Sequence, residues 1–225
     1  MHNAMQDNRF KKGVVIGAAE GNIGREICQY LNKKGHDMIE RNDPSNDYHG
    51  DLFVFCNGHT ELEWIGEQSI DKIITQVYSN LESTIQRINT LVASNSNDDV
   101  IKRIIIIGSM AYNNVLNGSS AYCAAKAGIN QYAKCAAYEL AKKNWLVHVI
   151  NPGNVLDTPM TSKVKDQLRP LHDLTQDEAE EYWQKVNNLG EFITKKDIAK
   201  IVKFLLKPEA RFLSGSSLDL RGSNR

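Results

Sequence analysis

Short apolar runs alternate with helical patterns along the whole chain. The runs that predict buried strands cover residues 13–17, 37–41, 52–56, 103–107, 145–150 and 216–220. Runs of four to six apolar residues between helical patterns are typical of a parallel sheet with crossover helices. We find no internal repeat or linker, so residues 11–225 are predicted to form a single α/β domain.

Apolar spacing predicts the helices between these strands. Ile23, Ile27 and Leu31 recur with helical period, and Gly35 is expected to end that helix. A long amphipathic helix is predicted over 70–92, because apolar residues recur there at positions 70, 73, 74, 77, 81, 85, 88 and 92. Residues 121–141 are rich in alanine and form a third predicted helix.

Capping signals mark two helix starts. Ser119 or Ser120 can cap the alanine-rich helix, and Thr194 with Asp197 resembles a capping box for a helix that ends before Pro208. The stretch 161–190 is polar and at best helical, and it is interpreted as a lid-like insertion.

Composition narrows the class of protein. The 225 residues carry 27 basic and 27 acidic side chains, which favours neither a nucleic acid nor an anionic membrane as a partner. No apolar run could cross a bilayer, and the polar tail 1–10 lacks the core of a signal peptide. The four cysteines form no CxxC pair, so no metal site is expected and a cytoplasmic location is predicted.

Glycines between the first strand and the first helix predict a phosphate-binding turn. They lie in the stretch 17–24, where Gly17, Gly21, Asn22, Ile23 and Gly24 would frame a pyrophosphate at the helix N-terminus. This arrangement at the start of a strand–helix–strand pattern favours a Rossmann-like, doubly wound sheet. Asp43 would hold the ribose hydroxyl of NAD, whereas Arg41 would meet the 2′-phosphate of NADP.

Tyr122 and Lys126 lie one helical turn apart on the predicted alanine-rich helix, and Ser109 follows the strand 103–107. A phenol is a weak acid, and a neighbouring lysine cation is expected to lower its pKa. Ser109 at the strand end could donate a hydrogen bond to a substrate oxygen. These residues therefore predict a general acid/base pair with an orienting hydroxyl.

The glycine-rich turn, Ser109, Tyr122 and Lys126 resemble the short-chain dehydrogenase/reductase family in order and spacing, over residues 13–222. The resemblance implies that Lys126 also binds the nicotinamide ribose and that Asn80 anchors a water linked to it. It further implies that Asn57 and Gly58 contact the nucleotide. Val155 and Thr158 would face its nicotinamide end, after the turn 151–153.

Departures from the family pattern affect the nucleotide side. An extra residue precedes the last glycine of the turn, and Phe55-Cys56-Asn57-Gly58 replaces Asn-Asn-Ala-Gly. Only residues 42–51 separate the second and third strands, where the family has a helix, a strand and a helix. We therefore predict a sheet trimmed to six strands, an adenine pocket with one open wall, and weak binding of the dinucleotide.

The resemblance implies an oxidoreductase that uses NAD or NADP to interconvert a secondary alcohol and a ketone on a small molecule. The family also pairs through its two central helices, which implies a homodimer or homotetramer; Ala124, Ala127, Gly128 and Ala136 would allow close packing. Two alternatives remain open. One is a non-catalytic dinucleotide-binding sensor or scaffold, and the other is a nucleotide-sugar epimerase or dehydratase.

Overall fold

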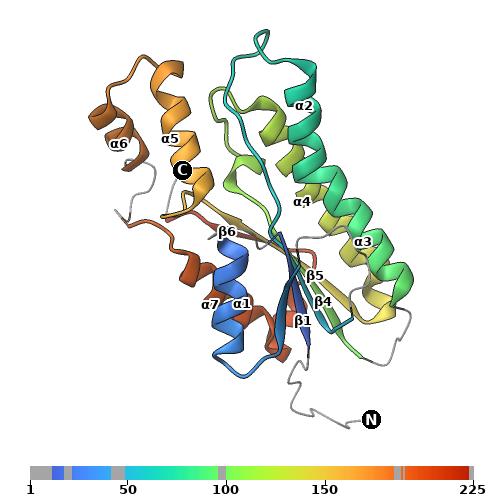
Figure 1. Ribbon diagram of the computed structural model, residues 1–225. Helices are drawn as coiled ribbons and strands as arrows, with labels where there is room; N and C mark the ends of the chain where they lie inside the picture. The colour runs from blue at the N-terminus through green and yellow to red at the C-terminus, as the bar shows by residue number, and fades with distance from the viewer. Residues whose placement is uncertain are drawn as a thin grey trace.

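One parallel sheet forms the centre of the computed structural model, which describes residues 12–17, 22–41, 49–95, 100–184, 189 and 191–222 (Figure 1). Its strands are β1 (Gly13–Ile16), β2 (Met38–Arg41), β3 (Leu52–Phe55), β4 (Lys102–Ile107), β5 (Trp145–Pro152) and β6 (Ser217–Leu220). They lie in the order β2-β1-β3-β4-β5-β6. The predicted six-stranded, doubly wound sheet is confirmed.

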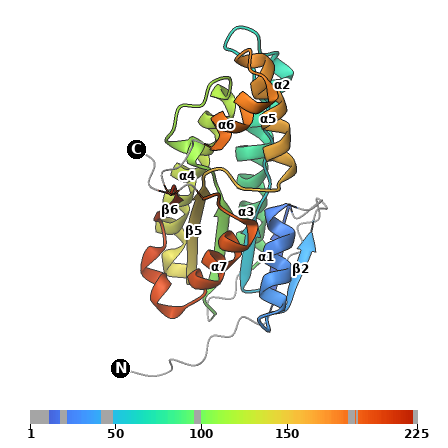
Figure 2. The same cartoon turned by 90° about the vertical axis from the view of Figure 1, so that its left-hand side faces the viewer.

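Helices cover both faces of the sheet. Helices α1 (Ile23–Asn32) and α7 (Lys195–Leu205) lie on one face, and α3 (Ser83–Ser94) and α4 (Ser120–Leu140) lie on the other (Figures 1 and 2). Successive strand residues point to opposite faces, so Val15 packs with α1 and α7 while Val14 packs with α3 and α4. Both layers are apolar, which explains why the strands appear as continuous apolar runs.

The long predicted helix is interrupted and only partly buried. It comprises α2 (Ile70–Val77), a π-helical turn (Tyr78–Glu82) and α3. Ile70 and Ile74 were predicted on its buried stripe, yet they are 66% and 57% exposed. The reason is that α2 extends past the carboxyl end of the sheet, where no strand can cover its apolar face (Figure 1).

The short connection after β2 is confirmed as well. Residues 42–51 join β2 directly to β3, and both strands pair with β1 in parallel register. Within the part of the chain that the structure describes, β2 is therefore the edge of the sheet. The segment 42–48, on which the open adenine pocket depends, lies outside the described residues, and that pocket stays a prediction.

The remaining helices lie mainly around the carboxyl end of the sheet. These are α5 (Pro159–Leu171) and α6 (Gln176–Gln184), with short 3₁₀ segments at Met110–Tyr112, Ala141–Lys143 and Pro208–Leu213. The capping box of Thr194 and Asp197 is present at α7. Ser119 occupies the N-cap of α4, but its side chain makes no capping hydrogen bond, so that part of the prediction is wrong.

Candidate active site

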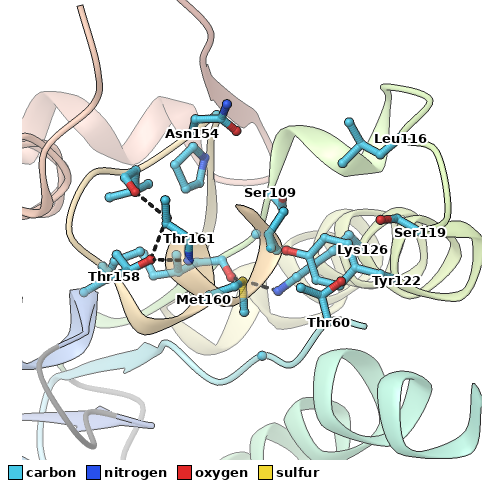
Figure 3. Close-up of a pocket in the computed structure, with 18 of the residues that line it drawn as sticks. Thr60, Ser109, Leu116, Ser119, Tyr122, Lys126, Asn154, Thr158, Met160 and Thr161 are labelled. Carbon is cyan, nitrogen blue, oxygen red and sulfur yellow. Dashed lines mark hydrogen bonds between the residues drawn. The ribbon is translucent and has the colours of Figure 1, made fainter. Parts of the chain in front are cut away.

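Ser109, Tyr122 and Lys126 meet at the carboxyl end of β4 and point into one space (Figure 3). Ser109 follows β4 directly, and the other two stand on the first turns of α4. The Ser109 hydroxyl oxygen accepts a hydrogen bond from the N–H of Ala111 at 3.2 Å. Its own hydrogen is therefore available for the Tyr122 phenol or for a substrate oxygen.

Burial controls the acidity of Tyr122. The side chain is only 7% exposed, and desolvation raises the pKa of its phenol to about 12, against a smaller lowering by a hydrogen bond from Ser109. The predicted lowering of this pKa by Lys126 is wrong: burial raises the pKa, and the group that opposes the rise is the Ser109 hydroxyl. Tyr122 is consequently a proton donor at neutral pH.

Lys126 is a buried cation next to that phenol. It is 3% exposed, its Nζ donates to the carbonyl oxygen of Ile107 at 3.5 Å, and Nζ lies 5.6 Å from the centre of the Tyr122 ring. Burial lowers the pKa of Lys126 to about 8. A lysine with such a pKa can hold or release a proton near neutral pH.

Asn80 lies on the buried side of the π-helical turn, as predicted, and is 2% exposed. Its amide nitrogen donates to the carbonyl oxygen of Gln76 at 2.8 Å, and its amide oxygen accepts from the N–H of His59 at 3.3 Å. A Cβ added to Gly58 would lie 3.0 Å from the Asn80 oxygen and 3.4 Å from Lys126 Nζ. Asn80 thus holds the turn after β3 beside Lys126, while its role as a water anchor stays a prediction.

A buried amide network fixes the backbone around the reacting groups. Asn151 on β5 is fully buried, and its oxygen accepts from the N–H of Ser109 at 3.2 Å and from the amide of Asn130 at 3.1 Å. The same Asn130 amide donates to the carbonyl oxygen of Lys126 at 2.9 Å. A Cβ on Gly108 would lie 2.1 Å from the Asn151 oxygen, so this position requires glycine.

The network continues to the last strand. Asn151 donates to a carboxylate oxygen of Asp219 at 3.0 Å, and the other Asp219 oxygen accepts from the Tyr112 hydroxyl at 3.0 Å and from Arg221 at 2.7 Å. These contacts tie β6 to the segment that carries Ser109. Sequence reasoning missed this network; the available signal was Asn130, an amide one turn after Lys126 on the buried side of α4.

The nucleotide end of the cleft lies at the start of α1. Gly17 has φ of +81°, and a Cβ there would lie 2.7 Å from the backbone nitrogen of Asn57. Gly17 therefore permits a close approach of β1 and the turn after β3 that no other residue allows. Asn22 and Ile23 line the cleft, Gly24 is buried in α1, and Gly21 lies outside the described residues.

Asn57 and Gly58 both line the cleft, but the amide nitrogen of Asn57 is already engaged. It donates to the Ser79 carbonyl oxygen at 2.9 Å and to the Thr84 hydroxyl at 2.9 Å. The amide oxygens of Asn57 and Asn22 are buried and have no partner in the described chain. Two unsatisfied acceptors facing one cleft fit a ligand with hydroxyl or amide donors, such as the riboses and carboxamide of a nicotinamide nucleotide.

Arg41 is the last residue of β2, where its carbonyl oxygen accepts the N–H of Gly17 at 3.1 Å. The exposed Arg41 side chain thus starts beside the phosphate turn. Its neighbour Glu40 pairs with Arg25 at 3.5 Å. Asp43, which was predicted to bind the ribose hydroxyl of NAD, lies outside the described residues.

Val155 and Thr158, from the segment between β5 and α5, also line the cleft. Thr158 lies across the cleft from Tyr122 (Figure 3). Val155 is 6% exposed and bridges to Ile193. The Thr158 hydroxyl caps α5 by accepting the N–H of Thr161 at 3.1 Å. Thr158 therefore shapes the nicotinamide end mainly through the position of its backbone and methyl group.

One cavity of about 550 Å³ runs from Asn22 and Ile23 to Tyr122, and Asn57, Gly58, Ser109, Lys126, Val155 and Thr158 also line it. The glycine turn, the helix N-terminus, the unpartnered Asn22 and Asn57 oxygens and the Lys126 ammonium fit a nicotinamide nucleotide along this path. No cluster of His, Cys, Asp or Glu in the described residues could hold a metal ion. Fold and site define a nicotinamide-nucleotide-dependent oxidoreductase.

Comparison with known proteins identifies the family. The model of a family described as enoyl-(acyl carrier protein) reductase matches residues 49–222. A 3-oxoacyl-(acyl-carrier-protein) reductase FabG of Haemophilus influenzae is 29% identical over 236 residues, which cover 97% of this chain and 91% of that protein. A benzil reductase of Bacillus cereus is 32% identical over 141 residues, or 62% of this chain and 49% of that protein.

Solved structures agree in fold. An actinorhodin polyketide ketoreductase with NADPH superimposes with a TM-score of 0.84 at 20% identity, covering 98% of this chain and all of that one. A short-chain dehydrogenase from Francisella tularensis gives 0.81 at 22% identity, covering 94% and 97%. The chain belongs to the short-chain dehydrogenase/reductase family, whose members act on CH–OH and carbonyl groups with NAD or NADP. The predicted family, enzyme class and cofactor class are confirmed.

Proposed function

We propose that this chain reversibly reduces a ketone to a secondary alcohol on a small organic molecule. The observation that carries the proposal is the convergence of Ser109, Tyr122 and Lys126 at one cavity, with Tyr122 kept protonated by burial. A sensor or scaffold would not need this arrangement. The epimerase or dehydratase alternative stays open, and the ketone assay described below tests against it.

Ser109, Tyr122 and Lys126 have different roles in the proposed reduction of the ketone. The nicotinamide, when bound, supplies the hydride. Ser109 donates a hydrogen bond to the substrate carbonyl oxygen and fixes its direction. Tyr122 donates its proton to that oxygen as negative charge develops, and the nearby Lys126 ammonium stabilises the phenolate that remains.

The high pKa of Tyr122 sets the expected pH dependence. Because the phenol is protonated up to a pH of about 12, the reduction rate should not fall through loss of its proton near neutral pH. Alcohol oxidation requires the phenolate, so its rate should rise with pH. Parallel pH–rate profiles in the two directions, read from nicotinamide absorbance, check this asymmetry.

A direct test uses purified protein, both reduced nicotinamide nucleotides and a panel of ketones. The proposal predicts ketone-dependent consumption of at least one nucleotide, and loss of this consumption in Tyr122→Phe. Saturable nucleotide binding without turnover of any ketone in the panel would favour the sensor instead.

A second copy of the chain is the proposed partner, over α2 and α4. Ile70, Ile74 and Tyr78 are exposed on the first helix, and Ala124 and Ala127 on the second. Gly128 and Ala136 were predicted to serve this contact. However, a Cβ at Gly128 would lie 3.1 Å from Leu81 of the same chain, and Ala136 is buried in the α3–α4 core. Sedimentation of wild type and Ile74→Glu tests the pairing.

We also propose a cytoplasmic location. The four cysteines lie within the described residues and are all unbridged, which fits a reducing compartment. No helix among the described residues has the length and apolarity needed to span a membrane. Fractionation of the native cell with an antibody to the chain is the test.

A further inference from the structure

We infer that the site takes an uncharged ketone with an apolar arm and a second uncharged hydrogen-bonding group, and that it discriminates against carboxylate and phosphate substrates. The inference rests on the proposed function and specifies its substrate class. Three observations carry it: the charge of the cavity wall, an unpartnered buried hydroxyl, and the pairing of the charges around the rim.

The cavity wall is almost free of charge. Among the described residues that line it, Lys126 is the one with a charged side chain, and this lysine is 3% exposed and placed against the Ile107 carbonyl and the Tyr122 ring. Five apolar side chains line the cavity on the substrate side, together with the uncharged Asn117 and Ser119; they are Leu62, Leu116, Met160, Val164 and Leu168. An anionic group bound there would lose its water without gaining a cation, which is costly.

Thr60 supplies a neutral hydrogen-bonding group in this wall. It is 4% exposed, lines the cavity that Tyr122 and Lys126 also line, and its hydroxyl has no hydrogen-bond partner within the described chain (Figure 3). A buried hydroxyl without a partner is destabilising, so its presence at the cavity surface fits a bound polar atom. Because a hydroxyl carries no charge, a carbonyl or hydroxyl group of the substrate suits it.

Charges at the rim are already paired with each other. Lys163 on α5 donates to Glu61 at 3.2 Å, His59 lies 3.3 Å from the same carboxylate, and Lys72 contacts Glu63. A substrate anion would have to take Lys163 from Glu61 and leave that carboxylate with one partner fewer. Of the described cations, Lys163, His59 and Lys72 are therefore already engaged with carboxylates and would bind a substrate anion only at a cost.

The same contacts hold the apolar wall in place. The side-chain oxygen of Gln167 on α5 accepts the N–H of Leu62 at 3.2 Å, and Leu62 and Leu168 are buried against each other with Val164 and Leu171. Glu61, paired with Lys163, and Leu62 lie on the turn after β3. The substrate wall is thus assembled by contacts between α5 and that turn.

Charge discrimination is tested with a β-keto ester and its free β-keto acid, using wild-type protein and the preferred nucleotide. We expect kcat/KM for the ester to exceed that for the acid by about 100-fold, because the wall gives the carboxylate no partner. Leu116→Lys should narrow this ratio about tenfold by raising kcat/KM for the acid, since it adds a cation to the wall.

Val115→Lys is the matched control. Val115 is 94% exposed, is not among the lining residues, and adds the same charge one position away. The ester-to-acid ratio should stay within about twofold of wild type. An equal change in both lysine variants would overturn the assignment of the apolar wall, because net charge would then explain the effect.

The role of Thr60 is tested with Thr60→Val and a pair of neutral substrates, the β-keto ester and a simple ketone of equal length. Loss of one hydrogen bond should lower kcat/KM for the ester about tenfold and leave the simple ketone nearly unchanged. Equal loss on both substrates would contradict a contact with the second polar group.

The outcomes separate this inference from the function on which it rests. If wild type reduces the acid as well as the ester and Tyr122→Phe abolishes both reactions, the substrate class is wrong and the proposed function stands. If no Tyr122-dependent turnover of either substrate or of the simple ketone occurs, the proposed function fails and the inference fails with it.

Discussion

The two ends of the cleft are built in different ways. At the reaction end, Tyr122, Lys126 and Asn151 are at least nine-tenths buried. The side chains of Asn151 and Asn130 bond the backbone N–H of Ser109 and the carbonyl oxygen of Lys126. At the nucleotide end, Arg41 is exposed on the edge strand and Gly17 serves mainly through its backbone. From this difference we infer that the reaction end tolerates little change, because its groups lie in a fixed interior. We infer that the nucleotide end tolerates more change, because it lies at the edge of the sheet.

This comparison gives a physical reason for the retained and altered motifs. The segment between β2 and β3 could be shortened because β2 remains paired with β1 when its outer neighbour is missing. No similar loss is possible around β4 and β5, since Ser109, Asn151 and Asp219 there hold one another in position. Substitutions at the reaction end should therefore affect turnover, and substitutions at the nucleotide end should affect affinity.

After Tyr122→Phe, which is treated last, the largest effect is expected from Ser109→Ala at the reaction end. Its hydroxyl is proposed to donate to the developing oxyanion, and removing one such donor costs about 100-fold or more in kcat. Nucleotide affinity should remain close to wild type, because Ser109 lies beyond the nicotinamide end. Steady-state kinetics with calorimetric titration of the nucleotide measure both quantities. A drop in affinity with unchanged kcat would place Ser109 at the wrong end.

Asn151→Ala should destabilise the fold and slow the reaction together. It leaves the N–H of Ser109, the Asn130 amide and an Asp219 oxygen each short of a buried partner, at about 1–3 kcal/mol per group. We expect a loss of about 3 kcal/mol in the free energy of unfolding by urea. Gln131→Ala, on the exposed side of α4, is the control and should change little. A stability equal to wild type would contradict the network.

Lys126→Met should raise the free energy of unfolding of the protein while lowering its activity. The folded pKa of about 8 lies below the ordinary 10.5, so the unfolded chain binds the extra proton between these values. The free energy of unfolding should therefore rise by roughly 2–3 kcal/mol as the pH increases from about 8 to about 10. Above that pH the raised pKa of Tyr122 has the opposite effect on stability. In Lys126→Met this rise should vanish and the stability at neutral pH should be higher. Urea titrations at several pH values measure it, and a rise that persists in the variant would mean another group causes it.

The smallest effect is expected at the edge strand. Arg41→Ala should weaken NADP binding about tenfold and leave NAD binding unchanged, if the guanidinium of Arg41, whose backbone carbonyl bonds Gly17, meets the 2′-phosphate. Asp43→Ala should do the reverse. Titration of each variant with both nucleotides shows whether Arg41 or Asp43 recognises the 2′ position of the ribose. Equal small effects on both nucleotides would exclude this role for both residues. Because β2 is the sheet edge, we also expect dissociation constants in the upper micromolar range.

The sequence predicted the six strands well because nearly every residue of β1, β3, β4 and β5 is buried. Ser109, Tyr122 and Lys126 were predicted because their spacing is local to one strand end and one helix. The exposure of Ile70 and Ile74 was not predicted, because apolar spacing shows which face of a helix is apolar but not how far the sheet extends beneath that face. The π-helical turn at Tyr78–Glu82 adds to that difficulty.

Two further features depend on long-range contacts. The amide network joins Ser109, Asn130, Asn151 and Asp219 from four separate segments, and only Asn130 gives a signal in its own helix. The pKa of Tyr122 was predicted to fall because Lys126 is near, whereas the depth of burial decides its sign. Depth is set by α4, β4 and the turn after β3 together, which spacing within one helix does not reveal.

One measurement tests the separation of the two ends most directly: kcat and the nucleotide dissociation constant, both determined for Tyr122→Phe. The variant removes only the phenolic hydroxyl, which is proposed to act on the substrate oxygen and not on the pyrophosphate. We predict that kcat on a β-keto ester falls by about 100-fold to 10,000-fold while the dissociation constant stays within about twofold of wild type. A variant that keeps more than about half of the wild-type kcat, or that loses turnover only through weaker nucleotide binding, would contradict the account.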